Sequence, residues 1–167
     1  MRKAFYSFIG IMLSFCTVFS SSVYALSENQ KNIISQYCAS MVQGFKTLQH
    51  VDVDNRVKLG SRYETAISKF MTPLNLRIVK NNLFVPELVD LQKTFADRRA
   101  SFNNNFTVYS KHLKELISID CQNYPEDFYN KLVETRKARE YVHQDVVYLN
   151  SILRIYKETV EKVKKEL

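Results

Sequence analysis

Apolar residues recur every three or four positions along almost the whole chain after residue 26, which is the period of an amphipathic helix. The pattern divides into four segments, about Ser27–Leu48, Asp54–Asn82, Pro86–Ile119 and Pro125–Leu167. No segment alternates with the period of two that is typical of strands, and turn residues are scarce, with 3 Gly and 3 Pro in 167 residues. The sequence therefore predicts an all-α fold, an antiparallel helical bundle of four main helices.

Capping and helix-breaking residues separate these segments. Ser27 has capping-box spacing to Gln30, and the polar residues around 50–52 predict a turn between the first two helices. Thr72-Pro73 interrupts the second helix, where Thr72 could cap a new short helix with Pro73 at its first position. Pro86 and Pro125 are placed to begin the third and fourth helices.

The third and fourth helices should form a long antiparallel hairpin, with the shorter first and second helices packed against it. Counting outward from their connection places Arg98 level with Asp145, and Arg139 level with Asn103–Asn105. An unpaired charge in a core is very unfavourable, so we expect Arg98 to pair with Asp145 and this polar layer of Arg98, Arg139 and Asp145 to define the register. The alternative is a groove that binds an anionic ligand, lined by Arg98, Arg99, Arg136 and Arg139.

The end of the fourth helix extends beyond the expected reach of the first two. Its apolar stripe should therefore be partly uncovered, and an exposed apolar patch usually marks a contact site for a protein partner or a second copy. The residues of this stripe are Leu149, Leu153, Tyr156, Val160 and Val163.

The first 25 residues have the three-part pattern of a secretory signal. Arg2 and Lys3 precede an apolar run, and Val23-Tyr24-Ala25 offers small residues for cleavage after Ala25. Residues 26–167 would then form a single helical-bundle domain in an extracytoplasmic location. Two alternatives remain, an uncleaved segment that tethers the protein to the membrane, and lipidation at Cys16.

Cys38 and Cys121 are the two cysteines of the processed chain. Outside the cytosol such a pair most simply forms a disulfide, the alternative being two buried thiols. A metal site lacks ligands at suitable spacing. In four helices that simply run up and down, however, the two cysteines would lie about 25 Å apart along the bundle axis, too far for a bond.

Charge and motif content argue against several functions. Basic residues number 24 and acidic residues 17, a net +7 that falls to +5 without Arg2 and Lys3, and the two signs alternate along most helices. A mixed surface of this kind does not predict nucleic-acid binding, although weak contact with an anionic envelope surface is expected. Glu140 and His143 have the E-x-x-H spacing of di-iron bundles, but no second copy accompanies them, and we interpret them as surface residues. No catalytic constellation stands out, and no cofactor is predicted.

One further pattern spans the stretch from Phe95 to Val147. Its residues are Phe95-Ala96-Asp97-Arg98-Arg99, Phe102, Tyr109, Asp120-Cys121, Pro125, Phe128-Tyr129, Arg136, Arg139 and Asp145-Val146. In these residues the stretch resembles uncharacterised small secreted helical proteins of ultrasmall, reduced-genome bacteria. The similarity covers about a third of the chain and implies an exported helical protein with a cysteine after the third helix, without implying an activity.

Together these features predict an exported, non-enzymatic helical-bundle protein that acts as a binding or structural component of the cell envelope or exterior. The alternatives are a carrier of a small apolar or anionic ligand within the bundle, and a membrane-tethered helical protein.

Overall fold

The computed structural model describes residues 26–166, which form five helical segments. These are α1 (Glu28–Thr65), the π-helical segment η1 (Ala66–Met71), α2 (Thr72–Lys80), α3 (Pro86–Ser118) and α4 (Pro125–Glu166). No strand occurs among these residues, so the predicted all-α class is confirmed. The predicted signal, residues 1–25, lies outside the described residues.

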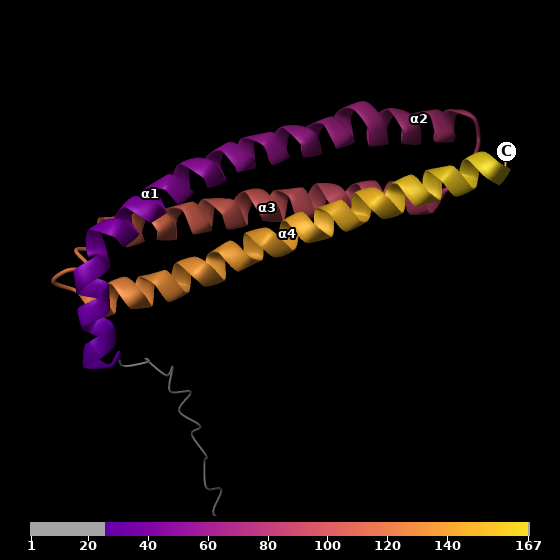
Figure 1. Cartoon of the computed structure of the whole chain (residues 1–167). Helices are drawn as coiled ribbons and strands as arrows, with labels where there is room; N and C mark the ends of the chain where they lie inside the picture. Colours follow the sequence, from indigo (N-terminus) through magenta and orange to yellow (C-terminus); the bar gives the residue numbers. More distant parts are fainter. Residues whose placement is uncertain (1–25, 167) are drawn as a thin grey trace, which may run out of the picture.

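The described chain forms three rods rather than a bundle of four helices. α1, η1 and α2 follow one another without a loop as one rod, α3 returns antiparallel to it, and α4 runs back along α3 (Figure 1). The predicted hairpin of the third and fourth helices is confirmed, because α3 and α4 form the most extensive helix pair. The predicted turn at residues 50–52 is wrong, since these residues are helical in the middle of α1.

Asp52 shows why the polar break in the apolar stripe is not a turn. Its side chain is only 14% exposed and faces the other two rods. There its carboxylate accepts hydrogen bonds from Tyr109 Oη at 2.6 Å and from Arg139 Nε at 3.1 Å. Residues 50–52 contain neither Gly nor Pro, so nothing in the backbone ends the helix. The polar residue therefore marks a contact between helices.

The predicted interruption at Thr72-Pro73 is a change of helix type. The backbone N–H of Thr72 donates to the carbonyl of Ile67, five residues back, which is the π-helical pattern. Pro73 lacks an N–H and lies in the first turn of α2, where a missing donor is tolerated. The Thr72 hydroxyl does not cap α2 and instead accepts a hydrogen bond from Gln92 Nε2 of α3 at 2.8 Å. The helix therefore continues through this segment, with one change in its backbone hydrogen-bond pattern.

Five side chains on one face of α3 form the centre of the core. They are spaced seven residues apart and none is more than 1% exposed: Leu88, Phe95, Phe102, Tyr109 and Leu116. α4 meets both neighbouring rods: Asp145 bonds to residues of α3, whereas Arg139 bonds to Asp52 of α1. A helix that contacts two partners has an apolar face wider than one seam.

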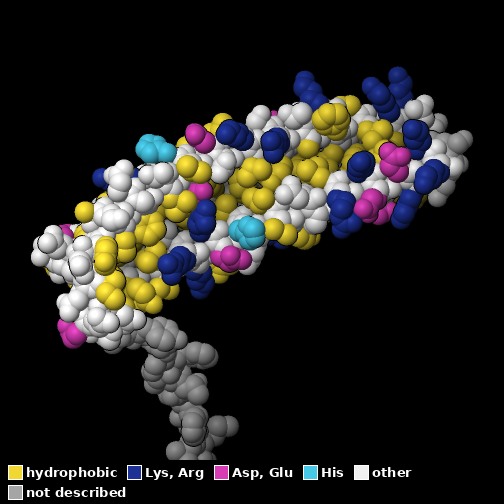
Figure 2. Space-filling model, viewed as in Figure 1, with side chains coloured by type: hydrophobic (Ala, Val, Ile, Leu, Met, Phe, Trp, Pro, Cys, Tyr) yellow, Lys and Arg dark blue, Asp and Glu magenta, His cyan; other side chains and the backbone are white. Residues whose placement is uncertain are grey.

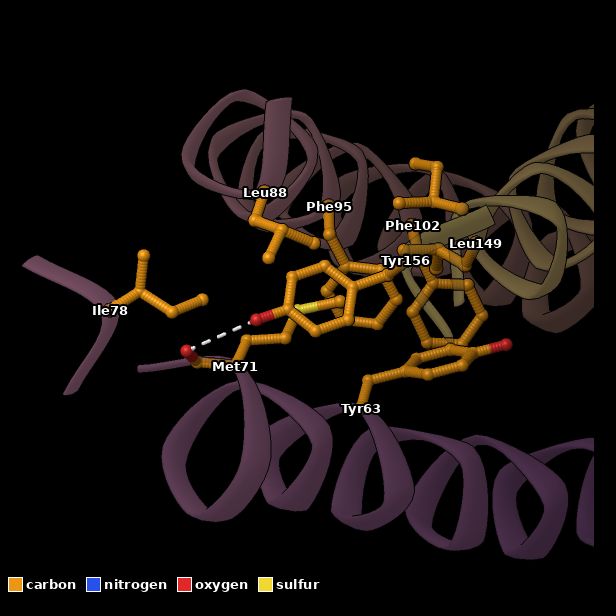
Figure 3. Packing of buried hydrophobic residues seen from close by; sticks show 9 residues of the cluster. Tyr63, Met71, Ile78, Leu88, Phe95, Phe102, Leu149 and Tyr156 are labelled. Carbon is orange, nitrogen blue, oxygen red and sulfur yellow. Dashed lines mark hydrogen bonds between the residues drawn. The ribbon is translucent and has the colours of Figure 1, made fainter. Parts of the chain in front are cut away.

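Two clusters of buried side chains fill the interior along the rods. The first joins α1, η1 and α2 to the hairpin, and in it Tyr63 packs edge-on against Phe95 and Phe102, with ring centroids 5.7 and 5.8 Å away (Figure 3). Tyr156 of α4 donates its phenolic hydrogen to Asn75 Oδ1 at 2.8 Å or to the Met71 carbonyl at 3.3 Å. The second cluster surrounds Cys121 at the α3–α4 turn.

Candidate functional site

The Arg98–Asp145 ion pair predicted from the hairpin register is confirmed. Arg98 Nη1 lies 2.9 Å from Asp145 Oδ1. Asp145 is 1% exposed, and its carboxylate also accepts hydrogen bonds from Asn105 Nδ2 at 2.7 Å and Ser101 Oγ at 3.2 Å. The Arg98 side chain is 38% exposed, and its guanidinium lies over the ring of Tyr148 at 4.3 Å. One buried carboxylate of α4 thus accepts hydrogen bonds from three side chains of α3 and joins the two helices.

Arg139, predicted to be level with Asn103–Asn105 in a buried polar layer, is instead exposed and takes its partner from α1. Its Nε and Nη2 lie 3.1 and 3.3 Å from the two oxygens of Asp52, so it joins α4 to α1. Tyr109 of α3 donates to the same carboxylate, and this contact between three helices was absent from the sequence prediction. Asp52, interpreted as part of a turn, was the polar residue in an apolar stripe that could have signalled it.

The predicted disulfide between Cys38 and Cys121 is present, with Cα atoms 5.5 Å apart. The conflict with the four-helix arrangement disappears because α1 does not fold back on itself. Its first turns cross the end of the hairpin at the α3–α4 turn (Figure 1). Ser35 Oγ donates to the carbonyl of Gln122 at 3.0 Å in the same region, so the bond fastens the start of α1 to that turn.

The stripe at the end of α4, predicted to be an uncovered interface, is largely covered. Leu149 is fully buried and Tyr156 is 6% exposed, while Leu153, Val160 and Val163 are partly buried. The prediction is wrong because α1, η1 and α2 form one rod that reaches the end of α4, whereas a folded-back pair would have stopped short. The rod shields the residues proposed to bind a partner.

A cleft of about 540 Å³ lies between α1 and α4. α3 supplies Phe106 to the floor, with Phe102 and Tyr109 almost fully buried beneath it, and Leu59, Val142 and Val146 add aliphatic surface. Between the rod of α1–α2 and α4, Figure 2 shows a band of hydrophobic side chains bordered by basic ones. The cleft arises because α4 packs far more closely on α3 than on α1.

Three arginines line this cleft, and they differ in how they are paired. Arg139 is held by Asp52. Arg56 lies over the Phe106 ring at 5.9 Å and is 3.4 Å from Asn103 Oδ1. Arg136 is exposed and forms no ion pair with the described residues. Arg56 and Arg136 thus form no ion pair among the described residues, although the carboxylates of Asp52 and Glu140 line the same cleft.

The alternative prediction of a four-arginine groove is met in part. Arg136 and Arg139 line the cleft, whereas Arg98 bonds to Asp145 and Arg99 forms an ion pair with Glu64. Arg56, which sequence reasoning missed, completes the basic set. Its signal was weak, because a charged residue on an exposed helical face is ordinary.

Tyr109 and Arg139, which both contact Asp52 at the cleft, keep their charge states near neutral pH. Burial, reinforced by the hydrogen bond to Asp52, raises the pKa of Tyr109 far above its usual value, so the phenol remains a donor. The hydrogen bond with Asp52 also raises the pKa of Arg139. The Asp52–Tyr109–Arg139 contact is therefore a stable wall of the cleft.

Glu140 and His143 both line the cleft and are exposed, in agreement with their interpretation as surface residues. In the part of the chain that the structure describes, no group of three His, Cys, Asp or Glu side chains could hold a metal ion. None of the helices within residues 26–166 combines the length and hydropathy that crossing a bilayer requires.

The fold and the cleft define this chain as an elongated three-rod helical protein with one disulfide and an arginine-lined groove. No protein-family model, curated protein or solved structure matches it.

Proposed function

We propose that this chain is an exported, non-enzymatic binding protein of the cell envelope or exterior. The cleft between α1 and α4 takes a small ligand with an apolar body and an anionic group. The observation that carries the proposal is the combination of an apolar floor around Phe106 with two guanidinium groups, of Arg56 and Arg136, that form no ion pair among the described residues.

The dimensions and chemistry of the cleft support this ligand class. Small-molecule sites usually measure about 300–1,000 Å³ and combine apolar walls with a few polar groups that orient the ligand. The cleft measures about 540 Å³, and partly buried apolar side chains supply its surface, namely Phe106, Leu59, Val142 and Val146. Arg56 and Arg136 flank this surface, and guanidinium groups suit carboxylate or phosphate because they donate two parallel hydrogen bonds.

The disulfide supports an extracytoplasmic location. Bonds such as Cys38–Cys121 persist in oxidising compartments and are rare in the cytosol. Amino-terminal sequencing of the exported protein tests the predicted processing. A start at Leu26 is expected, whereas a start at Met1 would indicate the membrane-tethered form.

Binding can be tested by titrating residues 26–167 with the anionic aromatic dye 8-anilinonaphthalene-1-sulfonate, and with its neutral analogue N-phenyl-1-naphthylamine. We expect the anionic dye to bind more tightly. Losing one charged hydrogen bond weakens binding by about tenfold or more, so Arg136→Ala and Arg56→Ala should each raise the Kd by that factor.

Lys137→Ala is the matched control, because Lys137 is an exposed neighbour of Arg136 that does not line the cleft. It should leave the Kd unchanged. Equal binding of the two dyes, or equal weakening by all three variants, would contradict the proposed site.

A further inference from the structure

The end of the molecule formed by η1, α2 and the loop to α3 has an unusual surface. The four most exposed large hydrophobic side chains of the described residues all lie between residues 70 and 84. They are Phe84 at 90%, Phe70 at 66%, Leu76 at 65% and Val79 at 64% exposed. Leu76 and Val79 are three residues apart in α2 and therefore neighbours on its outer surface.

This apolar segment is also free of acidic residues. From Thr65 to Pro86 the chain contains Lys69, Arg77 and Lys80 and neither Asp nor Glu. The C-terminal turns of α4 lie at the same end of the molecule and add Lys162, Lys164 and Lys165 (Figure 1). Figure 2 shows Lys and Arg side chains gathered at this end. Acidic residues nearby, such as Glu87, belong to α3 and α4.

The backbone presents the loop at the tip of the molecule. Asn82 adopts a positive φ of 56°, and the N–H of Leu83 donates to the carbonyl of Ile78 at 3.1 Å, which closes the end of α2. Asn tolerates this left-handed conformation better than most residues. The chain then reaches Pro86 through Phe84, whose ring contacts little of the protein.

A second cavity, of about 350 Å³, opens beside the loop. Its walls include Leu74, Leu83 and Val163, and Arg77 and Lys164 also line it. Apolar walls and two cations are the features that an acyl chain next to an anionic headgroup would contact.

We propose that this end, which we call the docking tip (residues 70–84), binds the surface of a bilayer that contains anionic lipid. Phe84, Leu76 and Val79 enter the interfacial region, and Arg77 and Lys80 lie against the headgroups. Surface-bound helices combine exposed apolar side chains with Lys and Arg in this way. The basic, acid-free segment favours an anionic lipid surface over a protein partner, and the inference is independent of the ligand assigned to the cleft.

The absence of Trp from the chain allows a direct test. Phe84→Trp introduces a single Trp at an exposed site, and its emission reports insertion. With vesicles of phosphatidylcholine and phosphatidylglycerol we expect a blue shift and quenching by brominated acyl chains. Vesicles of phosphatidylcholine alone and free glycerol phosphate should produce neither effect. Val57→Trp on α1, at a position 57% exposed, is the control and should not shift.

Charge reversal tests the electrostatic part. In the Phe84→Trp protein, Arg77→Glu with Lys80→Glu should weaken vesicle binding by about tenfold or more, since each basic side chain near an anionic surface contributes measurably. Lys58→Glu with Lys114→Glu changes the net charge equally at exposed sites on α1 and α3, and should have a small effect.

Several outcomes would overturn the proposal. These are no blue shift with anionic vesicles, an equal shift with phosphatidylcholine alone, or equal weakening by the two charge-reversed pairs. A concentration-dependent blue shift without vesicles would show that the tip binds a second copy of the chain instead.

Discussion

Replacing Arg98 by Ala should lower the free energy of unfolding more than replacing Asp145 by Ala, because the two partners of this ion pair differ in burial. Asp145 is 1% exposed, so Arg98→Ala leaves a carboxylate that cannot reach water and keeps only Ser101 and Asn105 as donors. Removing one partner of a buried ion pair costs about 3–5 kcal/mol. We expect the lower part of this range because the Arg98 side chain is 38% exposed.

Asp145→Ala should cost less, about 2–3 kcal/mol, although Asp145 is the more buried residue. The freed guanidinium of Arg98 can turn to solvent and remain over Tyr148. Ser101 and Asn105 can satisfy one another, since Asn105 Nδ2 already lies 3.3 Å from Ser101 Oγ. The loss is therefore that of hydrogen bonds to a charged group, without a stranded buried charge.

The double variant Arg98→Met with Asp145→Leu should lie within about 1 kcal/mol of the parent, because apolar replacement of a buried pair is often neutral. Urea unfolding followed by circular dichroism measures all three free energies, and the two-state assumption is checked with tyrosine fluorescence. If the double variant lost as much stability as Arg98→Ala and Asp145→Ala do together, or if Asp145→Ala were more destabilising than Arg98→Ala, the reasoning would be refuted.

Three further measurements test the fold. Replacing Cys38 and Cys121 by Ala should lower the free energy of unfolding by about 4.5 kcal/mol for a separation of 83 residues, with hydrogen exchange increasing first at the start of α1; an unchanged urea midpoint would contradict this. Burial raises the pKa of Tyr156 to about 12 and also raises that of Tyr109. The contribution of these tyrosines to stability should therefore be constant below pH about 10, where unfolded Tyr stays neutral, and stability should fall between about 10 and 12. A urea midpoint that rose over this range would have the wrong sign. Tyr156→Phe leaves the Oδ1 atom of buried Asn75 without a hydrogen-bond donor and should lower the free energy of unfolding by about 1–2 kcal/mol in the same assay; no change would show the bond to be unimportant.

The features that could be predicted from the sequence are those that depend on local periodicity. Heptad spacing and the two prolines that begin α3 and α4 predicted the hairpin. Counting along two antiparallel helices from their connection then placed Arg98 opposite Asp145, because the rise per residue is the same in both helices. The cysteine pairing followed from cysteine number and compartment.

Asp52 and Arg139 mark where this reasoning failed. A polar residue in an apolar stripe is compatible with a turn and with a contact between helices, and only the approach of Tyr109 and Arg139 distinguishes the two. The false turn shortened the first rod, and this in turn left Leu149 and Tyr156 uncovered in the prediction. One misread position therefore changed both the topology and the expected interface.

The sequence alone determined that the chain is helical, that α3 and α4 pair, and which two cysteines can bond. Tertiary structure decided which flank of α4 meets α1, what covers its apolar end, and that a cleft remains over Phe102 and Phe106. The physical reason is that the period of the sequence specifies which side of each helix is apolar. The hydrophobic effect favours covering that side but does not specify which neighbouring helix covers it.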